Sequence, residues 1–241
     1  MIDLHCHLLP GIDDGAARIS DSMTLARMAV NNGITHAVLT PHIQLGRYNN
    51  NRQRIEQAFA RFWQMLGEQE IPLGVSIGAE VRIDPMILPM VERDEIPFLG
   101  ELEGQPVMLL EFPHDQILPG SDKLVAHLLA RNIRPMIAHP ERNRAVIGQL
   151  ERIRPFVEMG CLLQLTAASL AGRFTPQIAR CARQLLERGW VEVIATDAHN
   201  STYRPPDLAQ GYTAAAAIVG EEAARALVLD HPLAIVASGM E

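Results

Sequence analysis

Short apolar runs, many of them rich in β-branched residues, alternate along the chain with longer segments in which apolar residues recur every three or four positions. The short runs predict buried strands, and the longer segments predict amphipathic helices. The predicted strands are Ile2–Leu4, Thr35–Thr40, Val75–Gly78, Pro106–Leu110, Pro135–Ala138, Cys161–Leu165 and Val191–Thr196. The predicted helices are Ser20–Asn32, Asn51–Glu68, Asp122–Arg131, Gln149–Glu158, Pro176–Arg188, Asp207–Val219 and Glu221–Leu229. Buried strands separated by helices indicate a parallel sheet that is covered on both faces.

About seven strand–helix units fit within the length of the chain, which favours an α/β barrel that is closed or nearly closed, of the TIM type. An open, doubly wound sheet is the alternative. No linker, internal repeat or low-complexity tract interrupts the pattern, so residues 1–241 are expected to form a single domain.

Histidines and carboxylates follow the predicted strands. In a parallel barrel, the loops after the carboxyl ends of the strands form the active face. Six of the seven predicted strand ends carry a His, Asp or Glu, and the resulting candidate ligands are His5, His7, Asp14, His42, Glu80, Glu111, His139, Asp197 and His199. Nitrogen and oxygen ligands without a thiolate are typical of a multinuclear site for Mn²⁺, Fe²⁺, Co²⁺ or Zn²⁺. The remaining histidines, His36, His114, His127 and His231, are interpreted as structural.

Composition narrows the functional classes. The net charge of −7 argues against a non-specific nucleic-acid or anionic-membrane binder. No apolar run is long enough to span a bilayer, and a first strand that starts at Ile2 leaves no room for a signal peptide. The three cysteines, an odd number without a Cys-x-x-Cys motif, favour a reducing compartment. We therefore expect a cytoplasmic protein without membrane insertion.

The cysteines do not form a thiol-phosphatase motif. A Cys-x5-Arg loop would place an arginine six residues after the nucleophile, but Ile12, Ala167 and Glu187 stand at these positions. Cys6 lies between two histidines on a predicted strand, so it points to the opposite face and is expected to be buried packing. A tyrosine phosphatase with this sequence would therefore have to depend on metal.

The spaced motifs resemble the polymerase and histidinol phosphatase (PHP) superfamily. Its metal motifs match the nine candidate ligands in order. Within the superfamily the chain is most similar to the manganese-dependent protein-tyrosine phosphatases that are encoded with bacterial capsule and exopolysaccharide genes. The matching phrases are HCHLLPGIDDGA, TPHIQLGRYNN, IGAE, LLEFP, IAHPERN, SLAGRF and ATDAHNSTYRPP, which span Ile2 to Pro206. Two positions depart from the family pattern, Asn143 and Thr166, and both are expected near the pocket.

The resemblance implies a distorted TIM-like (β/α)7 barrel, the PHP fold, formed by a single phosphatase domain over residues 1–241. It implies three divalent metal ions, with Mn²⁺ expected. One would be held by His5, His7, Glu80 and Asp197, a second by Glu80, Glu111 and His139, and a third by Asp14, His42 and His199. Four ligand carboxylates and three divalent cations would leave a net charge of about +2, which suits a phosphate dianion.

The resemblance also implies roles for arginines and a substrate. Arg142 and Arg204 match arginines that bind phosphate in the family, and a planar guanidinium pairs with two phosphate oxygens. Arg47 and Tyr48 are expected at the rim of the pocket as substrate-binding residues. The expected substrate is phosphotyrosine in the tyrosine-rich tail of a cognate bacterial tyrosine kinase, which would link the enzyme to capsule or exopolysaccharide synthesis. The sequence leaves the oligomeric state open.

Two other functions stay open at this stage. A small-molecule phosphatase of the histidinol-phosphate type, or a phosphodiesterase, would use the same metal motifs. A catalytically silent metal-binding scaffold is the alternative from a different class, although it would not require the complete ligand set.

Overall fold

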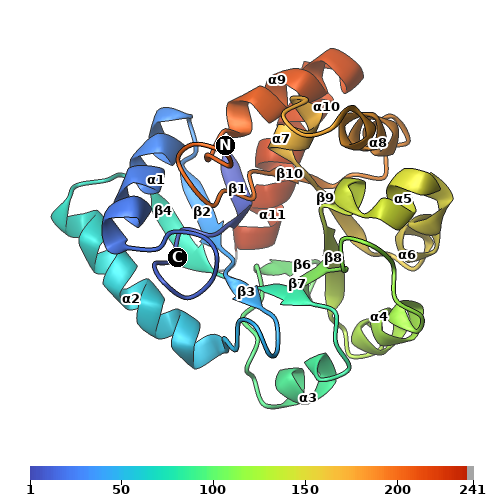
Figure 1. The fold of residues 1–241 in the computed structure, drawn as a ribbon, viewed down its shortest axis with the longest axis horizontal. Helices are drawn as coiled ribbons and strands as arrows, with labels where there is room; N and C mark the ends of the chain where they lie inside the picture. Colours follow the sequence, from blue (N-terminus) through green and yellow to red (C-terminus); the bar gives the residue numbers. More distant parts are fainter. Residues whose placement is uncertain (238–241) are drawn as a thin grey trace.

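Figure 1 shows residues 1–237, the part of the chain that this computed structural model describes, as a central ring of strands surrounded by helices. The strands are β1 (Ile2–Cys6), β2 (His36–Leu39), β3 (His42–Ile43), β4 (Gly74–Ile77), β5 (Glu80–Arg82), β6 (Glu101–Leu102), β7 (Gln105–Glu111), β8 (Arg134–Ala138), β9 (Leu162–Thr166) and β10 (Val193–Ala195). The helices are α1 (Ile19–Asn31), α2 (Arg52–Glu68), α3 (Ile87–Glu92), α4 (Ser121–Leu129), α5 (Arg144–Gly148), α6 (Arg154–Glu158), α7 (Ala167–Leu170), α8 (Pro176–Glu187), α9 (Leu208–Val219), α10 (Glu221–Arg225) and α11 (His231–Val236). This alternation confirms the predicted α/β class.

Backbone hydrogen bonds connect the strands into a ring. One parallel sheet has the order β1-β2-β4, and the other runs β10-β9-β8-β7-β5-β3, with β6 pairing antiparallel to β7. The two sheets meet where the Asp197 N–H donates to the His5 carbonyl over 2.7 Å and the His7 N–H donates to the Ala198 carbonyl over 2.8 Å. These bonds join the end of β10 to the end of β1. The ring rules out the open, doubly wound alternative and confirms a TIM-like barrel.

The barrel is distorted because two of its strands are interrupted. Two residues, Thr40 and Pro41, separate β2 from β3, and two more, Gly78 and Ala79, separate β4 from β5. Pro41 has no N–H to donate to a ladder. β2 therefore pairs with β4 below the break and β3 pairs with β5 above it. The apolar pattern predicted β2 and β4 but missed β3 and β5, which carry His42 and Glu80.

Two apolar clusters hold the fold together. The smaller cluster contains side chains from strands around the whole ring and from α11, so it fills the barrel interior. Its members include Ile2, Leu4, Val38, Val107, Leu109, Met136, Val193 and Ile235. The larger cluster lies between the strands and the surrounding helices. The interior apolar cluster ends below the carboxyl ends of the strands, which leaves that end of the barrel to polar side chains.

A β-bulge in β1 decides which side chains face the interior. Asp3 pairs with Ala37 and Cys6 pairs with Leu39, so three steps along β1 correspond to two along β2. Leu4 belongs to the interior cluster, whereas Cys6 packs in the outer cluster. The bulge thus interrupts the strict alternation of a strand and lets His5 and His7 face inwards above Leu4.

Helix boundaries follow local capping chemistry. The Thr175 side chain accepts from the Ile178 N–H at the start of α8, Pro176 occupies the first turn, and Gly189 with φ of 66° follows the last turn. The predicted helix Gln149–Glu158 is wrong in part: a 3₁₀ turn at Leu150–Arg152 precedes α6, because Pro155 cannot continue a helical ladder. The predicted helix Glu221–Leu229 is divided into α10 and a π-helical turn at Ala226–Asp230, and α11 follows it. Within residues 1–237, none of the helices has the length and apolarity to cross a bilayer.

Candidate metal centre

The nine residues that the sequence singled out converge at one end of the barrel. His42 and Glu80 lie on the short strands β3 and β5, and the other seven lie at or just after the carboxyl ends of β1, β7, β8 and β10. All except Asp14 are buried, with exposed fractions between 0% for His5 and 9% for His42. Asp14 lies on the loop after β1, and 41% of its side chain is exposed. Their roles as ligands stay a prediction, which the geometry below supports.

Four of these side chains point their donor atoms at one position. The Nε2 atoms of His5 and His7 lie 3.2 Å apart. Each Nε2 lies 3.4 Å from Glu80 Oε2 and 3.4 Å from Asp197 Oδ1. Ligands about 2.1 Å from a metal ion at tetrahedral angles are about 3.4 Å apart. The four atoms, here called the inner set, thus have the spacing of a single coordination shell.

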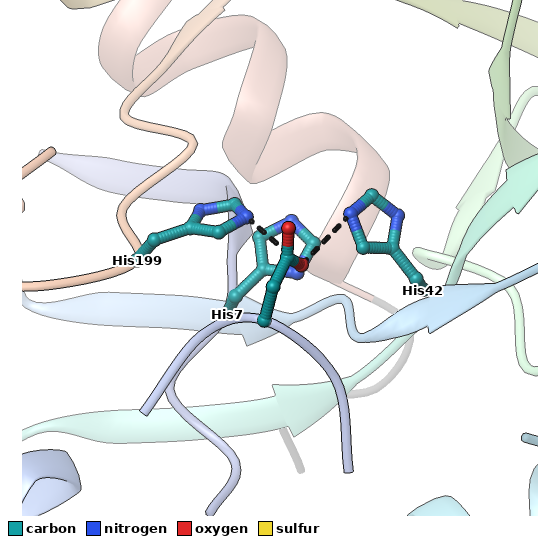
Figure 2. Close-up of side chains that lie close together, drawn as sticks. His7, His42 and His199 are labelled. Atoms are coloured by element: carbon teal, nitrogen blue, oxygen red, sulfur yellow. Dashed lines mark ion pairs between the residues drawn. The ribbon is translucent and has the colours of Figure 1, made fainter. Parts of the chain in front are cut away.

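A second group gathers around the exposed carboxylate of Asp14. Figure 2 shows His7, His42 and His199 pointing towards one another, with the ion pairs of His42 and His199 drawn as dashed lines. Asp14 Oδ1 lies 3.3 Å from His42 Nε2 and 3.5 Å from His199 Nε2. His7 joins these three residues as a group whose donor atoms all lie within 4.8 Å of one another. We call Asp14, His42 and His199 the outer set.

Glu80 connects the inner set to further candidate ligands. Its Oε1 lies 2.7 Å from His139 Nε2, and its Oε2 lies 2.8 Å from His42 Nδ1. Glu111 Oε2 lies 3.9 Å from His42 Nδ1. Glu80 therefore contacts donors of every predicted ligand group, as expected of a bridging carboxylate.

His114 was interpreted as structural, but the structure places it close to this region. Its ring lies 5.9 Å from that of His139, and its nitrogen belongs to a group with Glu111 and His139 that could hold a metal ion. The signal in the sequence was its position three residues after Glu111, in the loop of a strand end.

Hydrogen-bond partners at Nδ1 hold three of the imidazoles in place. His5 Nδ1 lies 2.9 Å from Gln164 Oε1, and His7 Nδ1 lies 2.7 Å from Asp13 Oδ2. His199 Nδ1 lies 3.0 Å from the Asp197 carbonyl. An acceptor at Nδ1 keeps the proton on that nitrogen and leaves Nε2 free to bind a metal. Sequence reasoning assigned no role to Asp13 or Gln164.

Asp13 also organises the loop that carries Asp14. Its carboxylate accepts from the Gly15 N–H over 2.9 Å and from the His42 N–H over 3.1 Å. Gly15 lies so close to His7 that a Cβ there would be 2.1 Å from the His7 carbonyl oxygen, so only glycine fits. Because Asp13 is a fifth carboxylate of the centre, it lowers the expected net charge with three divalent cations to about +1.

Five donor atoms that face the centre make no hydrogen bond of good geometry among the described residues, although His42 Nδ1 lies 2.8 Å from Glu80 Oε2 and Arg82 Nε lies 3.0 Å from Glu111 Oε2. These buried atoms are Glu80 Oε2, Glu111 Oε2, Asp197 Oδ1, His42 Nδ1 and His199 Nε2. An unsatisfied buried polar atom is costly, and folded proteins normally avoid it. Several such atoms at metal-ligand spacing fit a cluster of divalent cations bound by nitrogen and oxygen donors.

The surroundings of His139 and His199 lower the pKa values of their imidazoles. Burial and the nearby Arg142 guanidinium lower the pKa of His139 to about 3. Burial and the charge on His7 lower the pKa of His199 to about 4. Both rings are therefore neutral at pH 7, which is the form that binds metal ions.

Other candidate ligands hold protons more tightly. Burial opposes the charged forms of His5 and His7, but Glu80 and Asp197 raise the pKa of His5, and Asp13 raises that of His7 well above its usual value. Burial opposes the charged form of His42, but the Glu80 carboxylate overcomes this and raises the pKa of His42 to about 9. Burial and repulsion by Glu80 raise the pKa of Glu111 to about 7. The accumulated negative charge thus attracts protons to the positions where the sequence predicts cations.

Arginines complete the centre. The guanidinium groups of Arg142 and Arg204 both bind Asp197 Oδ2, while the Oδ1 atom of Asp197 faces the inner set. Arg82, which the sequence reasoning missed, lies with its Nε 3.0 Å from Glu111 Oε2. The two predicted phosphate-binding arginines therefore reach a predicted metal ligand.

The other two predicted substrate-binding residues lie beside His42. The ring of Tyr48 stacks on that of His42 with centroids 5.4 Å apart and planes 9° apart. The Arg47 guanidinium lies 4.9 Å from the centre of the Tyr48 ring. Asn143 is one of the two positions that depart from the family pattern. Its side chain accepts hydrogen bonds from the Ala145 and Val146 N–H groups and so caps the start of α5.

Comparison with known proteins identifies the family. Residues 1–237 match the family model described as capsular polysaccharide synthesis, CpsB/CapC. The chain belongs to this family. The tyrosine-protein phosphatase YwqE of Bacillus subtilis (strain 168) is 36% identical over 200 residues, which cover 83% of this chain and 78% of YwqE. The tyrosine-protein phosphatase CpsB of Streptococcus pneumoniae is 30% identical over 245 residues, which cover 98% of each chain.

Solved structures agree with this membership of the CpsB/CapC family. A crystal structure from work on YwqE of Bacillus subtilis and CpsB of Streptococcus pneumoniae, described as unique metal-dependent tyrosine phosphatases, matches with a TM-score of 0.90 and 33% identity over 97% of this chain and 93% of that one. The lactonase Lmo2620 of Listeria monocytogenes matches with a TM-score of 0.56 and 13% identity over 97% and 93% of the two chains, and so shares the fold alone. The predicted likeness to capsule phosphatases is confirmed, and PHP superfamily membership stays a prediction from the motifs.

Proposed function

We propose that this CpsB/CapC family member is a metal-dependent protein-tyrosine phosphatase. The observation that carries the proposal is the cluster of buried nitrogen and oxygen donors at metal-ligand spacing, several of them without a hydrogen bond, next to two arginines. Its family relatives YwqE and CpsB are tyrosine-protein phosphatases, and the matching crystal structure is of metal-dependent enzymes. Cations and arginines together suit the dianionic phosphate of a monoester.

We propose three divalent metal ions, with Mn²⁺ as the physiological ion. The inner set of His5, His7, Glu80 and Asp197 would hold one ion. Glu80, Glu111 and His139 would hold a second, and the outer set would hold a third. Bound divalent ions lower the pKa of water and stabilise negative charge on phosphoryl oxygens.

The residues of the chain would bind and orient the substrate. The fork of Arg142 or Arg204 pairs with two phosphate oxygens, and a phosphate that takes these contacts would replace those to Asp197 Oδ2. The leaving phenolate of tyrosine has a pKa of about 10, well below that of an alkoxide, so it departs with little proton donation. The site therefore suits an aryl phosphate without a dedicated acid residue.

The proposed substrate is phosphotyrosine on the tail of a cognate bacterial tyrosine kinase that acts in capsule or exopolysaccharide synthesis. The description of the family supports the link to capsule synthesis. We propose the cytoplasm as the compartment, which agrees with three unpaired, buried cysteines.

A substrate panel tests this function. Protein loaded with Mn²⁺ is assayed with a phosphotyrosyl peptide, p-nitrophenyl phosphate, histidinol phosphate and bis-p-nitrophenyl phosphate. We expect the highest kcat/KM for the phosphotyrosyl peptide. Faster turnover of histidinol phosphate or of the diester would instead assign a small-molecule phosphatase or a phosphodiesterase. Protein that binds no metal and hydrolyses nothing after addition of Mn²⁺ would be a silent scaffold.

A further inference from the structure

A polar pocket of about 300 Å³ opens beside the metal centre. It is bounded by the loop after β1, the turn after β3 and the first turn of α2, and its lining includes Asp13, Arg47, Tyr48, Asn50 and Arg54. No group of the inner or outer set lines it. The pocket is therefore a neighbour of the metal centre and shares with it only Asp13, which contacts His7 Nδ1.

Two arginines of this pocket have no anionic partner. Within residues 1–237, the guanidinium groups of Arg47 and Arg54 form no ion pair, and Arg47 contacts only the face of Tyr48 among aromatic rings. Arg52, two residues before Arg54, is bound by the Asp94 carboxylate at 2.8 Å and by two backbone carbonyls. Both pocket arginines are exposed, so their charge is available to a ligand.

A buried acceptor also lines the pocket. Asn50 is 2% exposed, and its Nδ2 donates to the carbonyls of Ile12 and His42 over 2.9 and 2.8 Å. These two bonds fix the amide, and its Oδ1 has no partner among the described residues. Asn50 therefore gives the pocket a fixed polar wall that connects the loop after β1 to β3.

The pocket connects to the metal centre through Tyr48. The Tyr48 ring contacts the Arg47 guanidinium and stacks on the imidazole of His42 in the outer set. The single carboxylate of the lining, Asp13, is already bound by His7 and by two backbone N–H groups. A substrate held at the metal centre would thus have a cationic pocket one aromatic ring away.

We infer that this pocket is a subsite for an anionic side chain that neighbours the phosphotyrosine in the substrate peptide. The inference rests on the proposed function and specifies its substrate class: peptides in which phosphotyrosine is followed or preceded by an acidic residue or by a second phosphotyrosine. Carboxylate and phosphate are the groups that a guanidinium fork pairs with through two bonds.

Binding of non-hydrolysable peptides tests the inference. Peptides with phosphonomethyl-phenylalanine in place of phosphotyrosine are titrated into Mn²⁺-loaded protein by calorimetry, with neighbouring positions occupied by alanine, by glutamate or by a second phosphonate. We expect the anionic neighbours to tighten binding by roughly three- to tenfold, the range for one or two exposed ion pairs. A larger gain with the second phosphonate than with glutamate would identify phosphate as the preferred anion.

Matched variants locate the effect. Arg54→Gln, and Arg54→Gln combined with Arg47→Gln, should reduce the preference for anionic neighbours to within about twofold, the remaining effect of general charge attraction. Arg61→Gln is the control, because Arg61 is an exposed arginine without an ion pair on the same helix two turns further along, and it should keep the wild-type preference. The preference should also weaken as salt is raised.

The outcomes separate the subsite from the proposed function. If wild-type protein hydrolyses phosphotyrosyl peptides but binds alanine and glutamate peptides equally, the subsite is refuted and the phosphatase remains. If Arg61→Gln removes the preference as fully as Arg54→Gln, the effect is overall charge and the subsite is also refuted. If the protein neither binds nor hydrolyses any phosphotyrosyl peptide, the proposed function fails and the subsite fails with it.

Discussion

The inner and outer sets of the metal centre are held by different means. In the inner set, His5 and His7 project from the end of β1, and each Nδ1 has a fixed acceptor in Gln164 or Asp13. Their carboxylate partners are 0% and 1% exposed. In the outer set, Asp14 is 41% exposed on a loop, and both nitrogens of His42 face carboxylates.

This difference indicates which ligands are arranged before a metal ion binds. Three of the four inner residues, His5, His7 and Asp197, lie at the joint between β1 and β10, and the fourth, Glu80, lies on β5, so the barrel itself sets their spacing. The outer atoms depend on the loop after β1, where 41% of the Asp14 side chain is exposed. We therefore expect the inner position to bind metal first and more tightly, and the outer position to bind with a larger rearrangement.

The largest effect is expected from Asp197→Asn in the inner set. Asp197 has φ of 52°, and asparagine tolerates this left-handed conformation, so the fold should survive. The substitution removes the negative charge that contacts two imidazoles and two arginines. Turnover of p-nitrophenyl phosphate should fall roughly a thousandfold or more. Metal content measured by mass spectrometry should fall as well, and activity within tenfold of wild type would refute the assignment of the inner set.

Metal affinity should rise with pH. In the metal-free protein the pKa of His42 is about 9 and that of Glu111 is about 7, so both hold protons below these values. A metal ion that binds these groups must displace the protons, and the loss of about one proton changes affinity by about tenfold per pH unit. Mn²⁺ titrations at pH 6, 7 and 8 should show this increase, and calorimetry in buffers of different ionisation enthalpy should detect the released proton. An affinity that does not change with pH would contradict the assignment of protons to His42 and Glu111 in the metal-free protein.

Removal of a supporting residue should weaken the inner set without removing a ligand. Asp13→Ala deletes the acceptor of His7 Nδ1 together with the acceptor of the Gly15 and His42 N–H groups. Loss of such a supporting contact typically reduces metal affinity by about 10- to 100-fold. Competition with a metal chelator measures the change. Glu56→Ala is the control, since it removes the same charge from an exposed position of α2 and should leave the affinity unchanged.

A smaller effect is expected at the arginines. Arg204→Gln removes a guanidinium that binds the Asp197 oxygen directed away from the inner set. Because a charge-assisted hydrogen bond contributes about 1.5–3 kcal/mol, we expect phosphate to inhibit roughly 10- to 100-fold more weakly. Metal affinity should change by much less. If metal affinity falls as far as phosphate affinity, Arg204 supports the ligands and does not bind substrate.

Much of the centre could be predicted from the sequence because parallel strands bring their carboxyl ends together. His42, Glu80 and Asp197 are far apart in the chain, yet each follows an apolar run, and the barrel places such positions side by side. The resemblance to the family motifs then indicated which ligands would share a metal ion. The helices were predicted where caps and apolar spacing agreed, as in α1, α2 and α8.

The orientation of the β1 side chains and the supporting roles of Asp13 and Gln164 depend on tertiary contacts, which the local pattern of apolar residues does not predict. Strict alternation along β1 would place Leu4 and His5 on opposite faces, and only the bulge against β2 brings both to the interior. Asp13 and Asp14 are adjacent aspartates, and the path of the loop alone decides which one supports His7. Gln164 did carry a signal, because a polar side chain within an apolar strand requires a partner.

The smallest effect is expected from Cys6→Ala, which tests whether the residue between the two inner histidines takes part in chemistry. The Cys6 side chain is 1% exposed, packs in the cluster outside the ring, and donates to the Val38 carbonyl over 3.5 Å. Burial raises the pKa of its thiol well above the usual value, so almost no thiolate nucleophile exists at pH 7. We expect kcat with p-nitrophenyl phosphate to stay within about twofold of wild type, and the free energy of unfolding to fall by about 1 kcal/mol through lost packing. A loss of turnover that exceeds the loss of folded protein, measured by thermal unfolding on the same samples, would show that the inner set depends on this thiol.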